Sequence, residues 1–281
     1  MMKTESKRTE SKRTDIKRTG MQITMHCNLK CKHCLGFFPY YSYEEKTTLS
    51  LEDARKVLDI YFQVVDTVEH FTVTGGEPLL NKEVAGILEE VYKYENQILG
   101  SVDFVTNGTM LIPDEVLQVF VEHKDKAKVV LSNYGDKLSL KIAENEERLK
   151  ALGITYRISE FCGDNLYYDG WIDFSDHSLK WDTIEKRDEN AQKCLHRVGK
   201  YFALRNGELH CCSRGKYRID NQIIDKIPGE YVPLMDETIS IEEKRKLLME
   251  MYEMKSSSSC AHCVGFKNGV PRVMPAQQLE D

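Results

Sequence analysis

The sequence predicts an α/β fold: a partial (β/α) barrel of five or six parallel strands, followed by a small C-terminal domain of a β-hairpin and helices. Short apolar runs alternate with longer segments of helical periodicity, which is typical of parallel strands joined by right-handed crossovers. A cysteine-rich or polar motif follows each of the first four apolar runs, and the carboxyl ends of parallel strands share one face. We therefore expect a leader over 1–20, the barrel over 21–185 and the C-terminal domain over 186–281.

The first twenty residues differ from the rest because they repeat a basic five-residue unit, as SKRTE, SKRTD and IKRTG. They contain seven Lys and Arg against three Asp and Glu, and few apolar side chains to bury. A basic arm that binds a partner is one interpretation. We expect instead a disordered, solvated leader outside the fold.

The elements of the barrel follow one another in regular alternation. Strands are expected at 21–26, 70–74, 101–106, 127–132 and 154–159. Helices are expected at 49–65, 83–95, 113–123 and 139–153. Ser50 and Pro113 suit helix starts, and Gly153 suits a helix end.

The composition excludes several classes of protein. A chain of 281 residues with 41% hydrophobic residues can bury a sizeable core. The net charge of −6 gives no indication of a nucleic-acid partner, and no apolar run approaches the ~18 residues of a membrane span. Nine cysteines without an export signal favour reduced thiols, metal binding and a cytoplasmic protein.

The segment HCNLKCKHC, residues 26–34, places Cys27, Cys31 and Cys34 in C-x3-C-x2-C spacing. Three thiolates can ligate three irons of a [4Fe–4S] cluster and leave the fourth iron open to chelate a small molecule. A zinc site completed by His26 or His33 is the alternative.

The segment TGGEP, residues 74–78, follows the next predicted strand. Gly75 and Gly76 permit close approach of the backbone, and Glu77 can accept hydrogen bonds from an ammonium group. Residues near the other strand ends and the cysteine loop are candidates for contacts with the ribose, carboxylate or adenine of the same ligand: Asn107, Ser132, Asn133 and His33.

The cysteine motif after the first strand, followed by GGEP after the second, resembles the radical S-adenosylmethionine (SAM) superfamily over about residues 21–160. The resemblance implies a [4Fe–4S] cluster on the three cysteines and the amino group of SAM at Gly75, Gly76 and Glu77. It implies a 5′-deoxyadenosyl radical that removes a hydrogen atom from a small-molecule substrate. We also expect an electron donor of the flavodoxin or ferredoxin type.

The remaining cysteines include a second candidate set of four thiolates: Cys194, Cys212, Cys260 and Cys263. The segment YFALRNGELHCC, residues 201–212, predicts a hairpin around RNG. The set resembles the twitch (truncated SPASM) extension of radical SAM enzymes, which implies an auxiliary [4Fe–4S] cluster. The G-x4-C spacing from Gly207 selects Cys212, and the neighbouring Cys211 is expected to face away. A structural zinc is the alternative.

Cys162 follows the fifth predicted strand in SEFCGDN. Its thiol could return a hydrogen atom to a substrate radical, although an ordinary, partly buried cysteine is the alternative. Further candidates for substrate contact lie nearby or follow the cysteine loop: Arg157, Trp171, Asp173, Lys180 and the aromatic segment 36–43.

The resemblance favours an enzyme that abstracts hydrogen from a hydroxylated small molecule such as a sugar, an aminocyclitol or a nucleotide sugar. Oxidation to a ketone and epimerisation are the two expected outcomes. A peptide-modifying enzyme is one alternative, and a zinc-stabilised binding protein without catalysis is another.

Overall fold

A single sheet of eight strands organises the protein in the computed structural model, which describes residues 13–163 and 171–280. The order across the sheet is β5-β4-β3-β2-β1-β6-β7-β8. The strands are β1 (Asp15–Gln22), β2 (Thr67–Thr74), β3 (Ile98–Thr106), β4 (Ala127–Asn133), β5 (Thr155–Glu160), β6 (Tyr201–Arg205), β7 (Glu208–His210) and β8 (Tyr231–Pro233). Strands β1 to β6 run parallel, whereas β7 and β8 are antiparallel to their neighbours. The predicted α/β fold is confirmed, with an open sheet.

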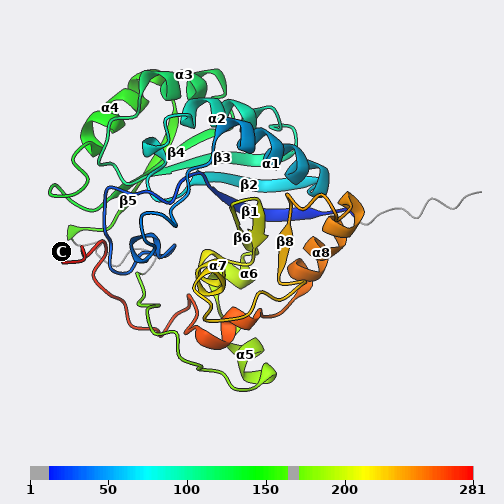
Figure 1. Ribbon diagram of the computed structural model, residues 1–281. Helices are drawn as coiled ribbons and strands as arrows, with labels where there is room; N and C mark the ends of the chain where they lie inside the picture. The colour runs from blue at the N-terminus through cyan, green and yellow to red at the C-terminus, as the bar shows by residue number, and fades with distance from the viewer. Residues whose placement is uncertain (1–12, 164–170, 281) are drawn as a thin grey trace, which may run out of the picture.

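Helices cover the outer face of the parallel strands (Figure 1). The α-helices are α1 (Leu51–Val64), α2 (Val84–Tyr92), α3 (Asp114–Glu122), α4 (Ile142–Leu152), α5 (Ile184–Ala191), α6 (Leu195–Val198), α7 (Ser213–Asp220) and α8 (Ile241–Glu253). Short 3-10 helices lie at η1 (Phe38–Tyr40), η2 (Pro78–Leu80) and η4 (Ser258–His262). Helix α1 packs against α2 and α8, and α2 packs against α3.

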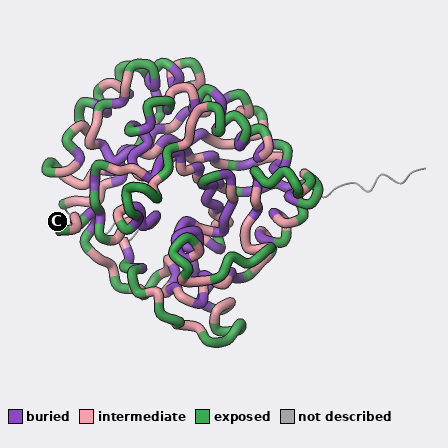
Figure 2. Tube along the Cα trace, viewed as in Figure 1, coloured by how far each residue is buried: buried purple, intermediate pink, exposed green. Residues whose placement is uncertain are grey.

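The main core lies between these helices and the sheet. Inward side chains of the parallel strands, such as Phe71 and Phe104, have no exposed surface. Tyr61 of α1 is equally buried, and its hydroxyl lies 2.8 Å from the Thr19 hydroxyl of β1. The buried segments run along the strands and the inner sides of the helices, while the outer rim is exposed (Figure 2). This packing fixes the strand ends that carry the sequence motifs.

The local signals at the helix ends are confirmed. The Ser50 side chain accepts a hydrogen bond from the backbone amide of Asp53, as an N-cap does. Pro113 precedes α3 directly, and Gly153 ends α4 with a φ of 66°. These features depend only on neighbouring residues, which explains why sequence reasoning found them.

Strand β1 begins earlier than predicted. It starts at Asp15 and takes in the third copy of the basic repeat, whereas we expected residues up to 20 to lie outside the fold. Both Ile16 and Thr19 are buried: Ile16 packs in the main hydrophobic core, and the Thr19 hydroxyl contacts Tyr61 of α1. The first part of the leader, residues 1–12, lies outside the described residues.

The predicted hairpin forms from β6 and β7, with Asn206 and Gly207 both at positive φ. This is the backbone that a tight hairpin turn requires. Strand β6 also pairs in parallel with β1, so the hairpin continues the barrel sheet. Because β1 leads into the first cysteine motif, this pairing brings both cysteine sets to one side of the molecule.

Candidate active site

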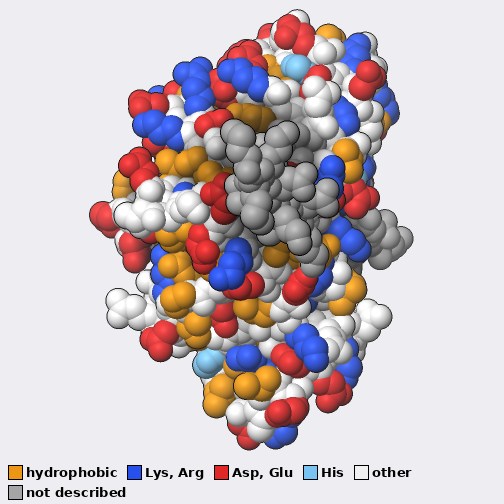
Figure 3. Space-filling view, turned by 90° about the vertical axis from the view of Figure 1, so that its right-hand side faces the viewer, with side chains coloured by type: hydrophobic (Ala, Val, Ile, Leu, Met, Phe, Trp, Pro, Cys, Tyr) orange, Lys and Arg blue, Asp and Glu red, His pale blue; other side chains and the backbone are white. Residues whose placement is uncertain are grey.

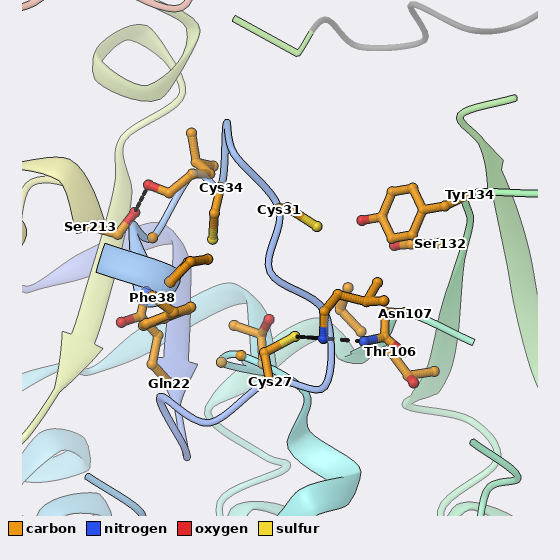
Figure 4. Close-up of a pocket in the computed structure, with 18 of the residues that line it drawn as sticks. Gln22, Cys27, Cys31, Cys34, Phe38, Thr106, Asn107, Ser132, Tyr134 and Ser213 are labelled. Carbon is orange, nitrogen blue, oxygen red and sulfur yellow. Dashed lines mark hydrogen bonds between the residues drawn. The ribbon is translucent and has the colours of Figure 1, made fainter. Parts of the chain in front are cut away.

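A cavity of about 320 Å³ lies at the carboxyl ends of the parallel strands, and we call it the main cavity (Figure 4). Cys27, Cys31 and Cys34 all line it from the loop after β1. The ends of four neighbouring strands supply other lining residues: Gln22, Thr74, Thr106 and Ser132. The structure thus brings the three predicted cysteines to one space.

Gly75 and Gly76 join the loop after β2 to the cysteine loop. The Gly76 amide donates to the Thr24 carbonyl at 2.8 Å, and the Glu77 amide donates to the His26 carbonyl at 2.9 Å. A Cβ on Gly75 would lie 2.4 Å from the Thr24 oxygen, and one on Gly76 would lie 2.1 Å from the His26 oxygen. Both glycines also line the main cavity. The contact between the two loops therefore requires glycine at both positions, and the same two residues form part of the cavity wall.

Burial governs the three thiols of the main cavity. It raises the pKa of Cys27 to about 11 and that of Cys31 to about 12, and it also raises the pKa of Cys34. Nearby N–H groups favour the thiolates: the Leu29 amide lies 3.4 Å from the Cys27 sulfur, and the Gln278 side-chain amide lies 3.5 Å from the Cys31 sulfur. Thiols buried in this way ionise readily only when they bind a metal centre, because its positive charge compensates that of the thiolates.

The carboxylate of Glu77 lies beneath the loop. It is fully buried and accepts hydrogen bonds from the Thr106 hydroxyl at 2.8 Å, the Asn107 amide at 2.8 Å and the Leu79 amide at 3.1 Å. Burial raises the pKa of Glu77 to about 7 despite these donors. Glu77 does not belong to the cavity lining, unlike the two glycines. Its expected contact with an ammonium group stays a prediction, while its contacts here tie β2 to the end of β3.

The polar candidates after β3 and β4 separate into two groups. Asn107 and Ser132 line the main cavity, and the Asn107 side-chain amide lies 3.7 Å from the Cys27 sulfur. Asn133 points elsewhere, because its side-chain amide donates to the Glu160 carboxylate at 2.7 Å on the edge strand. Since neighbouring strand residues face opposite sides, Ser132 and Asn133 could not both line the cavity.

A second hollow of about 210 Å³, the aromatic cavity, borders the main one. Tyr134 and Trp171 line both. His33 faces the aromatic cavity and not the main one, and its Nδ1 lies 3.5 Å from a carboxylate oxygen of Asp173. Stacking of His33 on an adenine stays a prediction, whereas the predicted place of Trp171 near the site agrees with the structure.

The four cysteines of the second set also meet. Cys194, Cys212, Cys260 and Cys263 line one small hollow, the auxiliary cavity, beneath α7. Cys212 caps the start of α7, where the Gly215 amide lies 3.4 Å from its sulfur. Burial raises the pKa of Cys260 to about 11. Burial opposes ionisation of Cys263 too, but the Arg214 and Arg218 guanidinium groups hold its pKa below the usual value.

Cys211 packs in the main hydrophobic core, where its sulfur lies 3.9 Å from the Glu230 carbonyl, yet it also reaches the border of the auxiliary cavity. The expectation that it faces wholly away is therefore only partly met. Ser213, the next residue after Cys212, lines the main cavity and donates to the Leu35 carbonyl at 3.3 Å (Figure 4). The first turn of α7 thus forms a wall between the main and auxiliary cavities.

Three of the weaker substrate candidates lie outside the three cavities: Cys162, Arg157 and Lys180. The Cys162 thiol lies 3.8 Å from the Glu160 carboxylate, which together with burial raises its pKa. Arg157 is exposed on the edge strand β5. Lys180 pairs with Asp176. No contact with the cavities is made by these three side chains, so a role for them stays a prediction without geometric support.

The aromatic segment 36–43 mainly packs. Phe37 and Tyr41 are buried in a small cluster with Tyr217, although Phe38 and Pro39 reach the main cavity. Asp173 accepts hydrogen bonds from Ser175 in addition to facing His33.

Several site residues were not found from the sequence: Gln22, Tyr134, Ser213, Arg214 and Gln278. Gln22, Tyr134 and Ser213 line the main cavity, Arg214 lines the auxiliary cavity, and Gln278 reaches the first site through its contact with Cys31. Gln278 does so because the chain end forms an antiparallel bridge with Cys31. The Lys32 amide donates to the Gln277 carbonyl at 2.7 Å, and the Leu279 amide donates to the Lys30 carbonyl at 2.8 Å.

The two sets of cysteines supply the thiolate ligands that iron–sulfur clusters require. Within residues 13–163 and 171–280, no three His, Cys, Asp or Glu side chains converge closely enough to hold a single metal ion. A cubane cluster needs its thiolates spread around a larger body, one thiolate to each iron. The cysteines line cavities in this way, three around one and four around the other.

A comparison with family models decides the class of the first site. Residues 21–156 match the model of the radical SAM superfamily. These residues form a radical SAM domain. The family implies SAM and one [4Fe–4S] cluster, in agreement with the three cysteines of the main cavity.

Several curated relatives of the chain share one activity name. GTP 3′,8-cyclase of Campylobacter jejuni (serotype O:6, strain 81116) is 25% identical over 272 residues, which cover 79% of this chain and 82% of the relative. GTP 3′,8-cyclase of Helicobacter pylori (strain HPAG1) is 26% identical over 91 residues, covering 32% of this chain and 27% of the relative. Among solved structures, BtrN in complex with AdoMet and 2-DOIA has a TM-score of 0.47 and 15% identity, covering 89% of this chain and 92% of that one.

These relatives correct the expected reaction. The prediction of sugar or aminocyclitol oxidation or epimerisation is wrong, because the curated proteins that align along most of the chain are named for a reaction of GTP. The cysteine and glycine motifs could not have revealed this, since the resemblance that they carry concerns the cofactor and not the substrate. None of the helices in the described ranges is long and apolar enough to cross a bilayer.

Proposed function

We propose that this protein is a radical SAM enzyme that removes a hydrogen atom from a small molecule bound beside the main cavity. The observation that supports the proposal most directly is the convergence of Cys27, Cys31 and Cys34 on one cavity at the strand ends of a radical SAM domain. When bound there, the cluster and SAM supply one-electron cleavage of SAM and a radical able to abstract hydrogen.

The protein's own residues hold and shield these groups. Cys27, Cys31 and Cys34 ligate three irons, and the amides near Cys27 and Cys31 stabilise the thiolates by hydrogen bonds. Gly75 and Gly76 leave room for a ligand at the cavity wall. Tyr134 and Trp171, which line both the main and the aromatic cavity, pack against the cysteine loop and give this side of the site an apolar wall.

We also propose a second [4Fe–4S] cluster in the auxiliary cavity, ligated by Cys194, Cys212, Cys260 and Cys263. Four thiolates complete the shell of a cubane and leave no iron open. The site would then exchange electrons and would not bind substrate directly. The first turn of α7 lies between this site and the main cavity. Ser213 lines the main cavity and Cys212 lines the auxiliary cavity.

A purine nucleotide is the first substrate to test, with GTP as the specific candidate. This part of the proposal rests on the names of the relatives. The aromatic cavity supports it, because Tyr134, Phe161 and Trp171 offer ring faces and edges on which a flat base can stack.

The first experiment measures iron and SAM cleavage after anaerobic reconstitution. The wild-type chain should hold about eight irons, as two cubanes do, and form 5′-deoxyadenosine under a strong reductant. Replacing Cys27, Cys31 and Cys34 by Ala should remove roughly half of the iron and abolish 5′-deoxyadenosine. Cys162→Ala is the matched control, because its thiol lies outside all three cavities. Continued formation of 5′-deoxyadenosine by the triple variant would overturn the assignment.

The second site and the substrate have separate tests. Cys260→Ala with Cys263→Ala should lose the other half of the iron and keep some SAM cleavage, because the first cluster is bound by another loop. Zinc in that site would refute the second cluster alone. With GTP present, deuterium from a labelled ribose should appear in 5′-deoxyadenosine. Absence of transfer from any ribose position would reject GTP and leave the radical SAM assignment standing.

A further inference from the structure

Three arginines surround the auxiliary cavity: Arg197, Arg214 and Arg218. All are buried, and Arg214 and Arg218 have an exposed fraction of only 1%. Among the described residues, none of the three forms an ion pair with a carboxylate, whereas the equally buried Arg205 pairs with Asp220 at 2.6 Å. This part of the protein therefore holds buried positive charge without a carboxylate as counter-charge among the described residues.

Arg214 is the member with the fewest partners. Its Nε and Nη1 have no hydrogen-bond partner among the described residues. Its guanidinium carbon lies 4.3 Å from the centre of the Phe174 ring, which provides a cation–π contact. The charged groups that act on it are the thiols of Cys212, Cys263 and Cys194, three of the four cysteines of the cavity.

The other two arginines are partly occupied by backbone oxygens. Arg218 donates to the Ser259 carbonyl at 3.1 Å and the His262 carbonyl at 3.0 Å, which fixes the segment that carries Cys260 and Cys263. Arg197 donates to the Met251 and Met254 carbonyls. Arg218 thus has a clear structural role, whereas the only polar side-chain partner of Arg214 among the described residues is Cys263, one of the four cysteines of the cavity.

A buried, unpaired cation is strongly disfavoured unless a negative group lies beside it. A [4Fe–4S] cluster with four thiolates carries a net charge of −2 when oxidised and −3 when reduced, from the sum of its ions and ligands. A fixed positive charge nearby stabilises both states, and it stabilises the more negative, reduced state more strongly. The same charge therefore favours reduction.

We propose that Arg214 is a positioning residue that offsets the charge of the second cluster and raises its reduction potential. The inference rests on the proposed second cluster. It goes beyond that proposal because it names the side chain that decides whether the cluster is readily reduced. Arg214 follows the wall residue Ser213 directly, so the main cavity and this charge lie on the two sides of one helical turn.

The test is a redox titration of the full-length chain, followed by electron paramagnetic resonance. It is performed on the wild-type protein and on the Cys27, Cys31, Cys34→Ala variant, in which only the second cluster contributes a signal. At a fixed applied potential, Arg214→Met should lower the reduced-to-oxidised ratio of the second cluster at least tenfold, which is 59 mV for a one-electron couple. Arg214→Lys should stay within about threefold of wild type, because it keeps the charge.

Arg205→Met is the matched control. It removes a buried arginine from the neighbouring strand, but one whose charge is already neutralised by Asp220. Its second cluster should titrate as in the wild type. An unchanged ratio in Arg214→Met with full iron would overturn the inference, and so would an equal shift in Arg205→Met.

Loss of the cluster is also informative. Loss of the second-site iron in Arg214→Met but not in Arg214→Lys would support charge compensation. Loss in both would assign Arg214 a packing role against Phe174 and refute the inference. The iron content of the wild type is measured first. A wild type without a second cluster would reject the second-cluster proposal itself, and the inference with it, before any arginine variant is made.

Discussion

Gly76→Ala tests whether the two loops of the main cavity must touch as the structure has them. The added Cβ would lie 2.1 Å from the His26 carbonyl oxygen and 2.6 Å from the carbonyl carbon. Both atoms belong to backbone one residue before Cys27, so no side chain can turn aside to make room. Either the variant loses stability or the cysteine loop moves.

The size of the effect follows from the contacts involved. Overpacking of this kind costs about 1–3 kcal/mol. Separation of the loops also breaks the hydrogen bonds from Gly76 to Thr24 and from Glu77 to His26, at about 1 kcal/mol each. The free energy of unfolding should therefore fall by roughly 3–5 kcal/mol if the loops stay paired elsewhere.

The assay combines urea unfolding of the cluster-free chain with iron content after reconstitution. Gly20→Ala on β1 is the matched control, because its Cβ would meet nothing closer than 3.8 Å. That variant should change stability by less than about 1 kcal/mol and keep all iron. Gly76→Ala should instead lose the iron of the first site. If Gly76→Ala matched Gly20→Ala in both measurements, the loop contact would not be what positions the cysteines.

Three further outcomes are expected. Gln278→Leu should speed the chelator-driven loss of first-site iron by about tenfold, because it removes the N–H donor at 3.5 Å from the Cys31 sulfur. Gln277→Leu is the control and should not change this rate, because Gln277 contacts the cysteine loop through its backbone carbonyl. Glu77 has a pKa of about 7 against an ordinary value of 4.5, so the folded cluster-free chain retains a proton that the unfolded chain releases. Its stability should fall by roughly 3 kcal/mol as the pH rises from about 4.5 to 7, and circular dichroism at a series of pH values should show that slope disappear in Glu77→Gln. Cys162→Ser should change the free energy of unfolding by less than about 0.5 kcal/mol and leave the formation of 5′-deoxyadenosine unchanged. A clear loss in either measurement would show that the Cys162 thiol has a role in the active site.

The exposed surface bears on partners. On the face shown in Figure 3, acidic and basic side chains are interspersed, and no large area of one sign stands out. This agrees with the mild net charge of −6. An electron donor remains a prediction, and a chemical reductant in the assays above makes the tests independent of it.

The sequence determined the alternation of strands and helices, the helix ends and the membership of both cysteine sets. Most of these features are local: the side-chain period distinguishes a strand from a helix, Ser50 and Gly153 act within one turn, and the first three cysteines lie in one short segment. The second set is dispersed along the chain and was grouped through its resemblance to the twitch extension. The parallel topology then placed the motifs at one edge of the sheet, so Cys27, Gly75 and Asn107 could be expected to meet.

The tertiary structure decided what no local pattern encodes. Pairing of β6 with β1 placed the two cysteine sets on either side of α7. The Glu77 carboxylate lies beneath its loop, where it accepts a hydrogen bond from the Asn107 amide. The Asn133 amide and the Cys162 thiol both face the Glu160 carboxylate and not the main cavity. The burial of Arg214 without a carboxylate is likewise a tertiary property, because its neighbours come from segments that are distant in the sequence.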